Sequence, residues 1–180
     1  MMRSTITLIL LLLIVTGFIM SSKQQEYHPS KGEQLVNSTL TNTAKVIQER
    51  YHIKPCGMGA AMPGGPIQGL TLCFDTNFPY SKVQLRELLI KSAEELLNQV
   101  NKNIEIQEFL KERPFSIKNI DIIIYNHDKN GFGLKDPQIS VANVSQGNLT
   151  YSTIDPEDSF KYKNEYDESY EEALKALSAP

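Results

Sequence analysis

The chain has 180 residues, of which 41% are hydrophobic and 22% are charged, a composition typical of one modest globular domain. Eighteen lysines and arginines stand against 21 aspartates and glutamates, and residues 155–180 alone carry eight acids and three lysines. This distribution excludes a basic face that would hold nucleic acid, so we expect no nucleic-acid partner.

The chain begins with an export signal. Arg3 is followed by an uncharged run, residues 4–22, whose centre is almost wholly apolar. Its length suits a cleaved signal peptide and just reaches the span of a bilayer, so both fates stay open. We predict a signal peptide or N-terminal membrane anchor over residues 1–22, with retention preferred. The domain then lies outside the cytoplasmic membrane, held through residues 4–22, or it is secreted if the leader is cleaved.

A polar segment, residues 23–42, comes next. It contains Pro29 and Gly32 and shows little apolar periodicity, which predicts a flexible tether. We therefore expect a single α+β domain over residues 43–180. Its first helix is predicted to begin at Asn42 or Thr43 and to end near His52.

A glycine-rich segment follows, with four glycines and two prolines in residues 56–66. Such a loop binds phosphate when a strand precedes it and a helix begins directly after it. Here a predicted helix precedes and a predicted strand follows, so we expect a flexible connection. Met58 and Met62 make it a possible partner surface.

The only two cysteines are Cys56 and Cys73. Because an exported chain meets an oxidising compartment, we predict a disulfide between them, with two free thiols as the alternative. His52 lies four residues before Cys56, and this spacing suggests a second hypothesis, a thiol nucleophile with its base. No third catalytic partner is recognisable in the sequence.

The centre of the chain has the clearest signals. Ser81 and Gln84 fit a capping box at the start of a helix predicted over residues 81–101. Apolar residues then recur at three- and four-residue steps, which indicates one stripe facing a core. The stripe consists of Val83, Leu85, Leu88, Leu89, Ala93, Leu96, Leu97 and Val100.

Strands flank this helix. We predict strands at residues 67–74, 119–125, 138–144 and 149–154, and a short second helix at 105–112. The connection between the first two strands is long enough for a right-handed crossover, so they can be parallel neighbours. The predicted fold is α+β, with a mixed sheet of about four strands in β-α-α-β-β-β order. The long amphipathic helix covers one face, and an N-terminal hydrophobic helix and tether precede the domain.

The C-terminal segment repeats a helical stripe. Ser169 and Glu172 form a second candidate capping box, and the apolar stripe consists of Tyr166, Tyr170, Ala173, Leu174 and Leu177. We expect Tyr166 and Tyr170 to line an acidic helical surface that is a second possible partner site.

No cluster predicts a metal or cofactor. The three histidines, His28, His52 and His127, are far apart in the sequence, whereas zinc needs three or four closely held ligands. The loop that begins at Asp128 lacks the closing glutamate of a calcium loop. We therefore predict no catalytic, metal or cofactor residues.

Residues 85–103, 109–115, 118–122 and 168–174 resemble a group of small exported bacterial proteins with no assigned activity. The resemblance covers roughly residues 43–177 and includes no catalytic motif. It implies a bacterial, extracytoplasmic compartment and no particular chemistry.

These observations favour an exported, membrane-anchored binding domain of the cell envelope whose partner is an envelope protein. One alternative is a small extracytoplasmic hydrolase or thiol enzyme that uses Cys56 and His52. The other is a structural envelope subunit.

Overall fold

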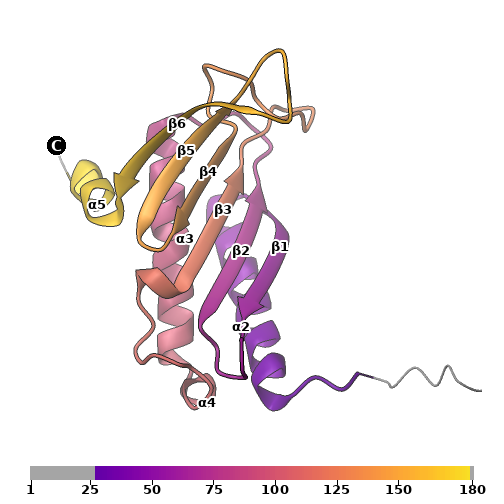
Figure 1. Cartoon of the computed structure of the whole chain (residues 1–180), viewed down its shortest axis with the longest axis vertical. Helices are drawn as coiled ribbons and strands as arrows, with labels where there is room; N and C mark the ends of the chain where they lie inside the picture. Colours follow the sequence, from indigo (N-terminus) through magenta and orange to yellow (C-terminus); the bar gives the residue numbers. More distant parts are fainter. Residues whose placement is uncertain (1–26, 179–180) are drawn as a thin grey trace, which may run out of the picture.

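The computed structural model describes residues 27–178, which form one sheet with helices packed on it (Figure 1). The sheet has six strands in the order β1-β2-β3-β4-β5-β6. The strands are β1 Lys54–Ala61, β2 Gly69–Asp75, β3 Ile120–Tyr125, β4 Val141–Ser145, β5 Asn148–Ile154 and β6 Tyr162–Ser169. All neighbours are antiparallel except β2 and β3, so the sheet is mixed.

Four α-helices accompany the sheet in this part of the chain: α2 Lys31–Tyr51, α3 Lys82–Lys102, α4 Ile104–Gln107 and α5 Tyr170–Ser178. A 3-10 turn, Ile117–Asn119, precedes β3. The two long helices pack against each other and cover one face, α2 over β1 and β2 and α3 over β3 and β4 (Figure 1). The short helix α5 contacts α3 beside the opposite edge of the sheet.

The predicted α+β class and the central crossover are confirmed. Strands β2 and β3 pair in parallel, with Leu72 opposite Ile122, and α3 connects them along the helix-covered face. Ser81 caps α3 in a complete capping box with Gln84. Most of the predicted stripe is buried, but Val83 is 59% exposed, because it lies about 160° around the helix from the buried Leu85 and so faces solvent. The short helix predicted at 105–112 is only the single turn α4.

The expected number of about four strands is wrong, and β1 is one of the two additional strands. The glycine-rich segment from Cys56 is not a flexible connection over its first half. It forms a regular antiparallel pair with β2 from Gly57 to Ala61. A methyl group at Gly57 would lie 3.4 Å from the Cβ of Cys73, at the near limit of ordinary van der Waals contact. Pairing with a neighbouring strand here outweighs a weak intrinsic strand preference.

The other additional strand, β6, contains Tyr166, which was predicted to lie on the C-terminal helix. Tyr166 and Tyr170 are four residues apart, a spacing that also fits two positions on one face of a strand. The segment pairs with β5, with Tyr151 opposite Tyr166. The helix α5 begins only at Tyr170, after the predicted capping box of Ser169 and Glu172, which is present.

The predicted tether over residues 23–42 is wrong from Lys31 onward, because α2 begins there. Ser30 and Glu33 form a capping box at its start. The buried side of the helix includes Thr39 and Thr43, and the Thr43 hydroxyl donates to the Thr39 carbonyl at 2.8 Å. Threonines on the packed face conceal the apolar periodicity that would have revealed this half of the helix.

The predicted leader, residues 1–22, lies outside the described residues. Between residues 27 and 178, no helix combines the length and apolar character needed to cross a bilayer.

Candidate functional site

A cavity of about 560 Å³ opens beside the first turn of α3. We call it the α3 pocket. It is lined by Pro79, Tyr80, Ser81, Lys82, Gln84, Pro137, Gln138, Ile139 and Tyr166. These residues come from the loop before α3, the first turn of α3, the loop before β4 and the edge strand β6, so the sheet topology brings together segments more than 80 residues apart. Its size is in the range of sites for small molecules.

Lys82 is the only charged side chain among these lining residues. Its Nζ atom lies 4.7 Å from the centre of the Tyr151 ring and 5.3 Å from the centre of the Tyr166 ring. Aromatic faces attract a cation at such distances. Within residues 27–178 the ammonium has no ion pair with a carboxylate, so its charge is available to the cavity.

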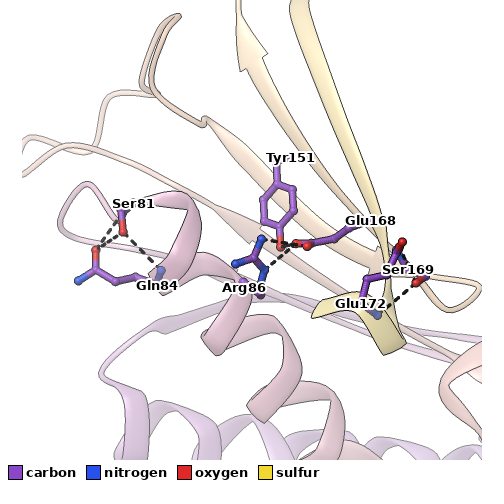
Figure 2. A network of polar contacts seen from close by, with 7 residues as sticks. All are labelled: Ser81, Gln84, Arg86, Tyr151, Glu168, Ser169 and Glu172. Atoms are coloured by element: carbon purple, nitrogen blue, oxygen red, sulfur yellow. Dashed lines mark hydrogen bonds and ion pairs between the residues drawn. The ribbon is translucent and has the colours of Figure 1, made fainter. Parts of the chain in front are cut away.

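An ion pair behind the pocket fixes the Tyr151 ring (Figure 2). Arg86 Nε donates to Glu168 Oε1 at 2.8 Å and Arg86 Nη2 donates to Oε2 at 2.9 Å, while the Tyr151 hydroxyl donates to Oε1 at 2.5 Å. Burial raises the pKa of Glu168, but the bonds from Arg86 and Tyr151 outweigh it and the pKa is lowered. Both oxygens of this carboxylate are therefore hydrogen-bonded to Arg86 and Tyr151, and the charge of Lys82 also helps to lower its pKa.

Asn126 holds two walls of the pocket. It is fully buried, and its amide nitrogen donates to the carbonyls of Tyr80 at 2.9 Å and Ile139 at 2.8 Å. Its amide oxygen accepts from the Tyr80 backbone N–H at 2.9 Å. One side chain thus joins the loop before α3 to the loop before β4.

A second cavity, of about 400 Å³, lies between α2 and the edge strand β1. We call it the α2–β1 groove. It is lined by Thr41, Ala44, Lys45, Gln48, Pro55, Cys56, Gly57 and Met58. Met58 is 54% exposed, and its sulfur accepts from the Thr41 hydroxyl at 3.9 Å.

The two cysteines are free thiols in the structure, so the predicted disulfide is not formed there. They are close in the sheet, because Cys56 lies at the irregularity of β1 that faces Cys73 on β2. Burial first, and then the charge of Asp75, raise the pKa of Cys56 to about 11. Burial also raises the pKa of Cys73. Such thiols stay protonated at neutral pH, which works against a nucleophilic role.

His52 does not line the same cavity as Cys56. It ends α2 in a left-handed conformation with φ 57°, and it lines a small separate cavity with Asn77. Another histidine, His127, has its Nδ1 atom 3.6 Å from Oδ1 of Asp75, the carboxylate whose charge helps to raise the pKa of Cys56. In residues 27–178 no three or more histidine, cysteine, aspartate or glutamate side chains are grouped so as to hold a metal ion.

The four residues predicted as partner surfaces divide into two pairs. Met58 and Tyr166 each line a cavity. Met62 and Tyr170 are half-buried against the core, and burial raises the pKa of Tyr170 to about 12. Sequence reasoning missed Lys82 and Asn126, because no local motif marks either residue.

Comparisons of the chain with protein-family models, with curated proteins and with solved structures found no match.

Proposed function

We propose that this protein is an exported, membrane-anchored, non-catalytic binding domain of the cell envelope. Its partner is an envelope protein, of which an extended segment pairs with the outer edge of β1. The sequence of residues 1–22 supports export, and the edge strand supports this mode of binding.

The open edge of β1 is the observation that carries the proposal. Within residues 27–178 this strand pairs only with β2, so its outer backbone N–H and C=O groups face away from the sheet. An unpaired edge is a template for a further strand from another chain. From Gly57 to Ala61 the side chains are small apart from Met58, and they leave the backbone accessible.

The opposite edge of the sheet has the features that discourage such pairing. β6 carries Lys163, Glu165 and Asp167 on its exposed length, and charged side chains on an edge strand oppose the addition of another strand. The two edges therefore differ in chemistry. Of the two, β1 is the edge suited to a partner.

The α2–β1 groove runs beside this open edge and supplies a place for a partner side chain. Ala44 and Met58 offer apolar contact, and Lys45 is the only charged residue in the groove lining. We infer that the bound segment carries an apolar side chain that enters the groove and an acidic residue that approaches Lys45. Backbone pairing supplies affinity, and the groove supplies specificity.

Site-specific photo-crosslinking in envelope membranes tests this proposal. A crosslinking residue in place of Met58 is expected to capture one envelope protein through one extended segment, identified by mass spectrometry. The control variant carries the crosslinking residue in place of Ile104, which is 87% exposed and lies in α4. A synthetic peptide of the captured segment should slow amide hydrogen exchange in β1 and should lose affinity for the Met58→Lys variant.

Three results would overturn the proposal. Equal capture by a crosslinking residue at Ile104 would show that capture is not specific to the edge of β1. A product of two copies of this chain would favour the structural-subunit alternative, and a peptide that leaves β1 exchange unchanged would show that the edge is not used.

A further inference from the structure

We propose that the α3 pocket binds a small organic carboxylate through Lys82, independently of a protein partner at β1. The site uses residues that the proposed function leaves without a role. Its ligand is defined by charge, by the walls of the cavity and by the number of available donors.

The charges around the cavity favour a monoanion. Lys82 and Arg86 each carry one positive charge, and Glu168 carries one negative charge that is paired with Arg86 through two hydrogen bonds. These three side chains sum to one positive charge, and Lys82, whose charge also acts on Glu168, is the one that lines the cavity. The N-terminal end of the 21-residue helix α3 adds partial positive charge on the same side.

The ammonium group is held in position before any ligand binds. It lies near the Tyr151 ring, which is fully buried, and near the Tyr166 ring, which is 46% exposed. The Tyr151 hydroxyl is fixed by Glu168, so this ring cannot turn freely. A pre-positioned cation loses less conformational entropy on binding than a free surface lysine does.

The remaining walls suit the apolar body of the ligand. Pro79, Pro137 and Ile139 contribute aliphatic surface, and the exposed face of Tyr166 contributes an aromatic wall. A flat or short aliphatic carboxylate therefore places its charged group on Lys82 and its carbon skeleton against these residues. Phosphate fits less well, because phosphate sites use several donors or an arginine fork, and Arg86 is already engaged.

Nuclear magnetic resonance titration of the full domain with benzoate tests the inference. Benzoate at about 10 mM, a concentration suited to a fragment-sized ligand, is expected to shift the amide signals of Ser81, Lys82 and Ile139. Benzamide, which has the same shape without the charge, should bind at least about tenfold more weakly, and inorganic phosphate should give no shift there.

Three variants and a control locate the site. Lys82→Met should weaken benzoate binding about tenfold, and Tyr166→Ala should weaken it as well, whereas Tyr166→Phe keeps the ring and the affinity. Lys102→Met, at the exposed far end of α3, should leave binding unchanged. Retained dispersion of the other amide signals shows that each variant is folded.

The inference is overturned if no probe shifts these amides, if benzamide matches benzoate, or if phosphate binds more tightly than benzoate. Equal weakening by Lys102→Met would also overturn it, because the effect would then be general charge attraction. Each of these results is independent of crosslinking at Met58.

Discussion

Asn126 pairs with both backbone polar groups of Tyr80, accepting from its N–H and donating to its carbonyl, each at 2.9 Å. The two residues are 46 positions apart in the chain. The same amide also donates to the carbonyl of Ile139 and accepts from the hydroxyl of Thr76. A single buried side chain therefore joins the loop between β2 and α3 to the loop between β3 and β4, beside the α3 pocket.

We expect Asn126→Ala to lower the free energy of unfolding by about 3 kcal/mol, because it leaves several buried backbone groups without partners. Urea denaturation followed by circular dichroism measures the change. The control is Asn130→Ala, an exposed residue of the following turn, which should change stability by less than about 0.5 kcal/mol. Equal stabilities of the two variants would contradict the role given to Asn126.

The ion pair of Arg86 and Glu168 supports a second prediction. Their side chains are only 16% and 14% exposed, so removing one partner leaves a poorly solvated charge. Arg86→Met should therefore cost about 3 kcal/mol of unfolding free energy. The double variant Arg86→Met, Glu168→Met should be more stable than the single variant, since no uncompensated charge remains. A strictly additive loss in this double-mutant cycle would show that the two side chains are not coupled.

Acid should destabilise the fold partly through Glu168. Its pKa is lowered in the folded protein from 4.5, so the unfolded chain binds a proton more readily. The resulting stabilisation is complete above the unfolded pKa and is lost as the pH falls through the folded pKa. Urea midpoints measured from neutral pH down to about pH 3 should fall less steeply in Glu168→Gln than in the wild type. Parallel curves would contradict this assignment.

The parts of the fold that sequence reasoning predicted are those with local signals. Ser81 and Gln84 marked the start of α3, and the leucine spacing marked its buried face. The strands β4 and β5 were predicted from the β-prone residues 138–144 and 149–154, and they pair antiparallel with Val144 opposite Leu149. These features depend on residues within a few positions of one another, so they are visible without knowledge of the tertiary structure.

The parts that were missed depend on contacts distant in sequence. Gly57 has a strand conformation because β2 pairs with it. Glu95 on α3 is a buried charged residue, and Arg50 on α2 donates to it at 2.5 Å. The α3 pocket combines Lys82 with Tyr166, and only the pairing of β5 with β6 brings them together. Tertiary pairing of this kind outweighs local preference.

The electrostatics of the thiols give a last prediction, made for the reduced protein. Burial first, and then the charge of Asp75, hold the pKa of Cys56 at about 11. A Cys73→Ser variant leaves Cys56 as the only thiol and removes the smaller contribution of Cys73 to this raised pKa. Alkylation of Cys56 by iodoacetamide should still be slow at neutral pH and should rise about tenfold per pH unit until the pH approaches the pKa of Cys56, because only the thiolate reacts. Adding Asp75→Asn to the Cys73→Ser variant removes a negative charge that opposes ionisation of Cys56. The curve of its alkylation rate against pH should therefore move to lower pH. Unfolding in urea should abolish the difference in alkylation rate between the proteins with and without Asp75→Asn. Fast alkylation of the folded Cys73→Ser protein at neutral pH would contradict the prediction and favour a reactive thiol.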